Sequence, residues 1–486
     1  MNSVSLLRSW RLKPKNSLKE ESTVYDIGLL MEDEMAQWLS AYAAALGLSV
    51  FCFKAPSSRS ELALLRPAAQ FFLWQFKEEG KMKDWGYKVQ SRRGKAFAHQ
   101  QMKALGEKKL RLPSSAQFRQ FPLAQLEAIE EEEESFICWH SQAGMELQAV
   151  RCRYLILSKG CPEKYIEQFE LLQQALPQLE KPLQHYQLKS KDKKRQRELL
   201  LLGQKAYTLE DDGQDLHYRF YGQDWSPEEE ERLLPGPALK SEKKLSKAYR
   251  LKNWRKGRLF VLGPLAHHLP AYFGLTSSLF WEEMGNLLWR LAYIQAGYLA
   301  EEPLLAAWEE EQGRDWQKVF GLQKELLKKQ ASFWSRLKEY WRGADFWAQR
   351  LAARKNPLLP NLPLEDAFER KTKLWAIKQK GFLLLGLAAN PVDLLAPKEL
   401  ALFARLRSQF VGLYQDRLPE QPRFAAAYQL PKLKELGRPG SLLLVGPQGC
   451  ILAVLKSRKK IQAFCKRLEQ EYPEPIKIEE EACEED

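Results

Sequence analysis

The feature that most constrains the fold is a strand–helix–strand unit near the N-terminus. Residues 25–31 (YDIGLLM) are an apolar run of strand length. Residues 34–46 (EMAQWLSAYAAAL) are rich in helix formers, and Gly47 follows them as a typical helix C-terminus. Residues 48–53 (LSVFCF) form a second apolar run. A helix between two such strands predicts a crossover that joins two adjacent parallel strands of an α/β sheet.

The rest of the first 355 residues also predicts a mixed α/β unit. Strands are expected at 135–139, 146–151, 154–157 and 257–263, helices at 62–80, 277–300 and 320–341, and an amphipathic stretch at 163–180. Residues 205–222 predict a hairpin whose turn is the Asp-Asp-Gly segment at 211–213.

A smaller unit follows a linker at 356–364, which contains the sequence NPLLPNLP. Strands are expected at 381–386, 409–414, 441–445 and 450–455, and helices at 398–408 and 458–471. This order of elements predicts a thioredoxin-like domain at 365–472 that has no redox dithiol. The segment 473–486 is acidic, and we expect it to be disordered.

Charge and length limit the kinds of partner. The formal net charge is +13, from 75 Lys and Arg against 62 Asp and Glu. The basic residues are dispersed, and their densest run, at 189–197, is typical of a solvated loop or helix face. We therefore expect no nucleic-acid partner. No stretch of about 20 apolar residues without charge occurs, so we expect no membrane span.

The cysteines indicate a reducing compartment. There are seven, an odd number, and no two have C-x-x-C spacing. Neither a disulfide scaffold nor a zinc site is predicted, and reduced thiols in a cytoplasmic protein are expected. Residues 1–22 are polar, are expected to be flexible, and lack the features of a secretory signal.

A specific motif register lies between residues 263 and 291. The chain reads GPLAHHLP at 263–270, GLTSS at 274–278 and EMGNLLWRL at 283–291. Without a gap, these segments resemble G-D-A-A-H-x-x-P-P, G-Q-G-x-N and D-A-x-N-L-x-W-K-L of the class A flavoprotein monooxygenases, the family of para-hydroxybenzoate hydroxylase and phenol hydroxylase. The flanking segments at 255–258 and 303–311 are similar to the family's basic lead-in and its L-L-x-x-Y-E-x-E-R segment.

The resemblance implies a Rossmann-like FAD/NAD(P)-binding fold with an inserted substrate-domain sheet and a C-terminal thioredoxin-like domain. The implied parts are a flexible N-terminus (1–22), a hydroxylase-like core (23–355), a linker (356–364), a thioredoxin-like domain (365–472) and an acidic tail (473–486). Within the core, the resemblance implies an FAD-type βαβ unit at 25–55, a substrate-type sheet at about 185–250 and an FAD-type strand and helix at 257–300.

The family's phosphate-binding loop is altered in this chain. The loop G-x-G-x-x-G lets backbone N–H groups approach the pyrophosphate at a helix N-terminus. Its three glycine positions are Met31, Asp33 and Ala36 here. Glu32 and Glu34 add further negative charge, which complements the helix dipole but repels phosphate.

Three other FAD contacts of the family are also altered. The acid that accepts the ribose hydroxyls is Lys54, the Asp of the D-G motif is Lys159, and the Asp that binds the ribityl chain is Pro264. The segment that holds the flavin pyrimidine carries Thr276 and Ser278. These replacements predict impaired or lost FAD binding.

Few site residues can be assigned. By family position, the cofactor-binding residues are Gly263, Pro264, Gly274 and Asn286. The adjacent His267 and His268 point apart on an extended segment, so no metal site is expected. No catalytic residue is assigned.

Two functions remain open on the sequence. The first is an aromatic-hydroxylase-like monooxygenase that uses FAD and NAD(P)H, as a degenerate member of the family. The second is a non-catalytic binding or interaction protein that keeps the fold and a hydrophobic cavity for a small apolar or aromatic molecule. The oligomeric state is open, and a dimer is one alternative.

Overall fold

We analysed a computed structural model of the 486-residue chain. The structure describes residues 20–56, 60–64, 87–89, 98–101, 118–141, 147–176, 182–188, 207–211, 216–221, 241–245, 248–268, 275–328, 359–378, 381–415, 418–419, 426–431 and 433–473.

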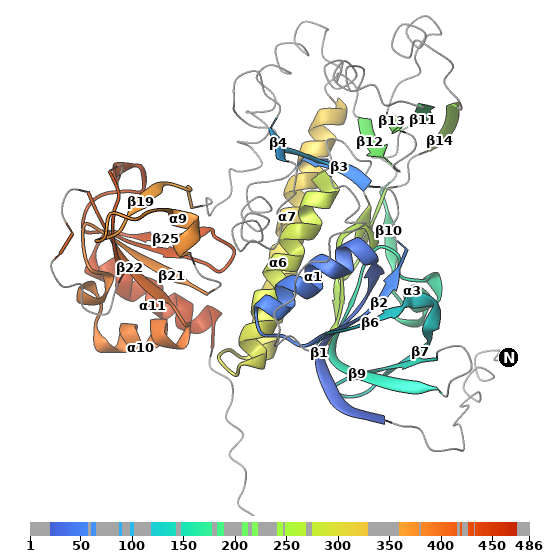
Figure 1. The fold of residues 1–486 in the computed structure, drawn as a ribbon, viewed down its shortest axis with the longest axis horizontal. Coiled ribbons are helices and arrows are strands. Elements are labelled where there is room, and N and C mark those ends of the chain that lie inside the picture. Colours follow the sequence, from blue (N-terminus) through green and yellow to red (C-terminus); the bar gives the residue numbers. More distant parts are fainter. Residues whose placement is uncertain are drawn as a thin grey trace, which may run out of the picture.

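The predicted strand–helix–strand unit is confirmed. Strand β1 (Glu20–Glu32) leads into helix α1 (Asp33–Ala45), and β2 (Val50–Ala55) pairs with β1 in parallel. The predicted strand at 257–263 is β17 (Leu259–Val261), which pairs in parallel with β9 (Gln148–Leu157) of the same sheet. Because β9 also runs parallel to β1, segments far apart in sequence form one α/β core (Figure 1).

Further strands complete this sheet, which has eight strands within the described residues in the order β16-β17-β9-β1-β2-β6, with β8 on β9 and β7 on β8. Their bounds are β6 Phe118–Pro122, β7 Leu126–Glu131, β8 Phe136–His140 and β16 Arg255–Lys256. The strands predicted at 146–151 and 154–157 are one strand, β9, because its backbone pairs continuously with β8 and β1.

One helix prediction was wrong in its described part. Residues 62–64 of the helix expected at 62–80 belong to strand β3 (Ser60–Leu64), which pairs with β5 and β12; residues 65–80 lie outside the described residues. Pairing of β3 with distant strands overrides local helix propensity. In the amphipathic stretch at 163–180, helix α3 (Glu163–Gln168) is followed by Glu170, which adopts a left-handed φ of 55°, and then by β10 (Gln173–Ala175).

A second sheet contains the predicted hairpin. Strands β12 (Tyr207–Asp211) and β13 (Leu216–Tyr221) are antiparallel, as expected; the predicted turn extends beyond the described residues. Among the described residues the order is β14-β11-β13-β12-β3-β5-β4, so the sheet also takes strands from residues 60–101. The remaining bounds are β4 Tyr87–Val89, β5 Ala98–Gln101, β11 Pro182–Leu188 and β14 Ser241–Leu245.

Two long helices follow the core. Helix α6 (Leu275–Gln295) ends before residue 300, the end predicted from the sequence. Gly297, just after the helix, adopts a φ of 69°. Helix α7 (Glu301–Lys328) begins well before the predicted residue 320. Two acids and a proline in its first turn, Glu301, Glu302 and Pro303, favour a helix start there. No helix in the described parts of the chain has the length and hydropathy needed to cross a bilayer.

The C-terminal unit has the expected central order. Strands β21 (Leu383–Leu387) and β22 (Gln409–Tyr414) are parallel and are joined through α10 (Pro397–Arg405). The hairpin of β24 (Leu442–Val445) and β25 (Ile451–Leu455) precedes α11. The other bounds are β19 Pro363–Glu365, β20 Lys371–Lys373, α9 Leu374–Ile377, β23 Ala426–Gln429 and α11 Arg458–Glu471. The end of the predicted linker is therefore strand, because β19 pairs with β20 and β23.

The C-terminal unit packs against helix α6 through an aromatic cluster. Trp289 and Tyr293 of α6 lie edge-to-face on Phe382, with ring centroids 5.8 and 6.0 Å apart. The Tyr293 hydroxyl donates a hydrogen bond of 2.9 Å to the carbonyl of Leu406. The α6–α7 pair therefore shares one apolar core with the C-terminal unit (Figure 1).

Truncating this cluster should destabilise the protein. Trp289 is 1 % exposed, so Trp289→Ala leaves a cavity and should lower the free energy of unfolding by about 3–5 kcal/mol. The control Phe368→Ala removes a ring that is 78 % exposed and should change it by less than about 0.5 kcal/mol. Urea denaturation measures both values, and equal losses would contradict this packing.

A buried lysine makes stability depend on pH. Burial lowers the pKa of Lys378 to about 7, so between that value and about 10.4 the unfolded chain binds a proton that the folded chain does not. The contribution of Lys378 to stability should therefore rise with pH across this window. Lys378→Met should remove the rise, which urea denaturation at several pH values measures against wild type. Parallel pH profiles of the two proteins would contradict the assignment.

Candidate functional site

The first glycine position of the phosphate-binding loop is part of the sheet core. Met31 is fully buried and pairs with Lys54 of β2, and Ala36, at the third position, is a fully buried residue of α1. The side chains of Asp33 and Glu34 lie outside the described residues. A buried methionine side chain therefore stands where the family has only a hydrogen atom.

Two contacts within the chain lie at the N-terminus of α1. Glu32 is the N-cap residue of this helix, and its side chain makes no capping hydrogen bond. Its backbone N–H donates to the carbonyl of Lys159 at 2.7 Å. Its carboxylate, with 12 % side-chain exposure, pairs with the Lys159 ammonium at 3.5 Å.

The glycine after Lys159 holds this closure in place. Gly160 has a φ of 93°, which favours glycine, and a Cβ there would lie 2.8 Å from the Ala55 Cβ and 3.1 Å from the Glu32 nitrogen. The ends of β9 and β2 thus meet the start of α1 at contact distance. The Lys-Gly pair at the family's D-G position therefore covers the helix terminus that would bind the pyrophosphate.

The ribityl position is also occupied by internal contacts. Gly263 has a φ of 59°, and its N–H donates to a carboxylate oxygen of Glu283 at 2.8 Å. The other Glu283 oxygen lies 2.6 Å from Nε2 of the fully buried His267. Pro264 has no N–H, and its carbonyl accepts the Tyr249 hydroxyl at 2.9 Å. Glu283 thus locks the strand-to-helix turn from inside.

Asn286 lies in an interior polar network rather than at an open surface. Its amide nitrogen donates to Glu311 at 2.9 Å, and its side-chain oxygen accepts from Trp289 at 3.2 Å. The same oxygen accepts from Arg290 and from Gln448 of the C-terminal unit. Arg290 also pairs with Glu311 at 3.0 Å. The network ties α6, α7 and the C-terminal unit together.

The structure describes the remaining predicted positions only in part. Gly274 lies outside the described residues, and Thr276 and Ser278 lie on α6 without described side chains. His267 and His268 form β18, paired with β15 (Tyr249–Leu251). The family-position assignment of Gly263, Pro264, Gly274 and Asn286 as cofactor residues stays a prediction.

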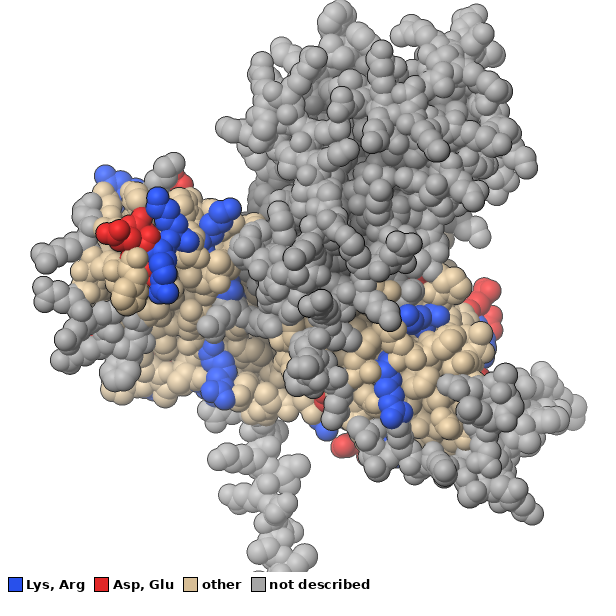
Figure 2. All heavy atoms as spheres, in the orientation of Figure 1, with Lys and Arg blue, Asp and Glu red and all other residues tan. Residues whose placement is uncertain are grey.

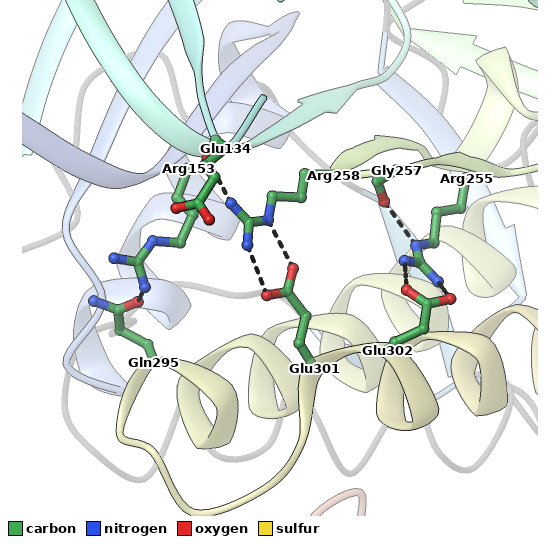
Figure 3. A network of polar contacts seen from close by, with 8 residues as sticks. All are labelled: Glu134, Arg153, Arg255, Gly257, Arg258, Gln295, Glu301 and Glu302. Carbon is green, nitrogen blue, oxygen red and sulfur yellow. Dashed lines mark hydrogen bonds and ion pairs between the residues drawn. The ribbon is translucent and has the colours of Figure 1, made fainter. Parts of the chain in front are cut away.

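The basic lead-in at 255–258 has a structural partner (Figure 3). Arg258 makes a two-pronged contact with Glu301 at 2.8 and 2.9 Å, and Arg255 does the same with Glu302. Hydrogen bonds donated by Arg255 lower the pKa of Glu302, and those that Arg258 donates to Glu301 raise the pKa of Arg258. Since both acids lie in the first turn of α7, they also complement its dipole. This basic segment fastens α7 to the sheet.

Sequence reasoning treated Glu283 only as a conservative replacement of the family's Asp. The available signal was its extra methylene, which lets the carboxylate reach both Gly263 and His267 from α6. Among the described residues, no three His, Cys, Asp or Glu side chains converge as metal ligands.

No family model and no curated protein matches the chain. Solved structures match nearly all of it. The complex of aklavinone-11 hydroxylase with FAD and aklavinone superposes with a TM-score of 0.63 at 14 % identity, covering 94 % of this chain and 99 % of that one. Anhydrotetracycline hydroxylase from Streptomyces rimosus gives 0.56 at 15 %, covering 92 % and 99 %. A Diels-Alderase of pyrroindomycin biosynthesis gives 0.58 at 14 %, covering 88 % and 96 %.

The chain has the fold of the FAD-binding aromatic hydroxylases. The residues of this hydroxylase fold do not fit a dinucleotide bound in the usual way. Glu32 pairs with Lys159 beside the helix N-terminus, a methionine fills the first glycine position, and Gly263 gives its N–H to Glu283.

Removing the internal carboxylate should be costly. Glu283→Ala leaves the buried His267 and the Gly263 N–H without their acceptor, and should lower the free energy of unfolding by about 3–5 kcal/mol. Glu301→Ala is the matched control, since the partly exposed Arg258–Glu301 pair should be worth about 1 kcal/mol or less. Chemical denaturation compares the two, and a smaller loss for Glu283→Ala would refute the locking role.

Proposed function

We propose that this protein is a flavin-free member of the hydroxylase fold that acts by binding a small apolar or aromatic molecule. The Glu32–Lys159 closure carries the proposal. It engages the backbone N–H of the N-cap residue with the Lys159 carbonyl and places an ion pair beside the helix N-terminus where the family holds phosphate. A dinucleotide would have to displace this closure and approach a carboxylate of its own charge sign.

The comparisons support a role for this fold beyond oxidation. One matching structure is named a Diels-Alderase, and a Diels–Alder cycloaddition consumes no electrons from a reductant. Another holds aklavinone together with FAD, so its fold accommodates an aromatic ligand beside the cofactor. We infer that the ligand-binding part of the fold can persist after the flavin contacts are lost.

A second candidate function is a hydroxylase that binds FAD in an altered mode and takes electrons from NAD(P)H. It is favoured by the match to the FAD complex over 94 % of this chain and 99 % of that one. The match therefore includes both the part of that structure that holds FAD and the part that holds aklavinone. Flavin binding separates the two candidates.

Two narrower assignments extend the proposal. We assign the sheet of β1, β2 and β9 to a Rossmann-like unit, because its strands are parallel and α1 crosses between two of them. We assign residues 365–472 to a thioredoxin-like domain, supported by the parallel β21–β22 pair and the antiparallel β24 and β25. Six free cysteines among the described residues fit a reducing, cytoplasmic setting.

Restoring one family contact should not restore flavin binding. Pro264→Asp repairs only the ribityl contact, worth about 1–3 kcal/mol, and Asp33→Gly leaves Met31 and Glu32 in place. Micromolar to nanomolar FAD binding needs about 8–12 kcal/mol. Wild type and both variants should therefore leave FAD fluorescence unquenched at micromolar concentrations.

The same titration with an aromatic probe tests the binding role. The probe 1-naphthol should change the tryptophan fluorescence of wild type with saturation, whether or not FAD is present. Micromolar FAD binding by wild type would return the protein to the hydroxylase candidate. Tight FAD binding by either single variant would show that the altered contacts are not independent. Absence of saturable naphthol binding would remove the proposed ligand class.

A further inference from the structure

Helix α11 has one buried face and one basic face. Ile461, Phe464, Cys465 and Leu468 pack into the core shared with α6. Exposed cations lie on the opposite face of α11 and just before the helix. They are Lys456, Arg458, Lys459, Lys460, Lys466 and Arg467. Figure 2 shows both blue and red side chains among the tan ones on the visible face of the C-terminal unit.

Only some of these cations have an acid to pair with. Arg458 pairs with Glu399, and Arg467 with Glu471 at 3.1 Å. Within the described residues, no ion pair involves four lysines of this basic face: Lys456, Lys459, Lys460 and Lys466. Like charges gathered on one helix repel each other, so the face is complementary to an anionic partner.

We propose that the occupant of this basic face is the chain's own acidic segment at 479–486, bound along the outside of α11. Six of its eight residues are Glu or Asp. Only residues 472–478 separate it from the end of α11, so the contact is intramolecular and has a high effective concentration. Individually weak, exposed ion pairs can then act together.

The lengths agree with this placement. The chain is fixed beyond α11, since Tyr472 packs on Phe382 at 5.6 Å and the Pro473 carbonyl accepts the Ala300 N–H at 3.2 Å. The five residues at 474–478 can span about 17 Å. Lys466 lies about 8 Å from the helix end along its axis. The acidic segment can therefore turn back and reach it.

The acidic segment also matches the length of the basic face. Eight extended residues span about 26 Å. The helix from residue 458 to residue 471 is about 21 Å long. Running antiparallel to α11, the segment would meet Lys466 first, and then Lys460, Lys459 and Lys456. Salt weakens such exposed ion pairs by screening the charges.

A zero-length carbodiimide cross-linking experiment on the full chain tests the proposal. At about 10 mM salt, where the screening length is about 30 Å, peptide mapping should find intramolecular amides between 479–486 and Lys459, Lys460 or Lys466. At about 1 M salt, where it is about 3 Å, their yield should fall at least about tenfold.

Matched charge reversals complete the test. K459E/K460E/K466E should lose these cross-links at low salt, while K371E/K373E/K434E, which reverses three other exposed lysines, should keep them. Circular dichroism checks that both variants fold. Cross-links from 479–486 that are intermolecular, that favour other lysines, or that survive the first triple reversal would overturn the proposal. An intermolecular result would assign the face to a second copy of the chain.

Discussion

The buried Glu283 carboxylate is the contact on which the core arrangement depends. It joins the Gly263 N–H at the end of β17 to the ring of His267 in β18. Because Glu283 projects from α6, one side chain fixes the turn after β17, strand β18 and helix α6 relative to each other. An unpaired carboxylate would be expensive at 4 % exposure, so the turn and the helix must fold together.

The same logic explains how the fold can stand without a dinucleotide. A helix N-terminus and the end of a parallel strand leave backbone N–H groups that need acceptors. In this chain Lys159 supplies a carbonyl to Glu32, and the Glu32–Lys159 ion pair covers the junction. Residues that would oppose a phosphate thus satisfy the fold's own polar groups, so cofactor binding and stability make opposite demands on the same positions.

Much of the fold could be predicted from the sequence because its strongest signals are local. Buried strands such as 25–31 are continuous apolar runs, and the 263–291 register fixes a strand, a turn and a helix together. Strands β3 and β10 could not be predicted, since their extended form depends on partners at least 35 residues away in sequence. The start of α7 carried a usable signal in Glu301, Glu302 and Pro303.

The candidate site was harder to predict than the fold because it is defined by pairings. Sequence identified Glu32 as an added acid and Lys159 as a replaced family residue, and gave no indication that they meet at 3.5 Å. Taken alone, the Glu32 carboxylate would repel a phosphate and the Lys159 ammonium would attract it. As an ion pair the two charges largely neutralise each other, so neither acts on a ligand as it would alone. What the two replacements mean for phosphate binding therefore depends on a pairing that only the folded structure shows.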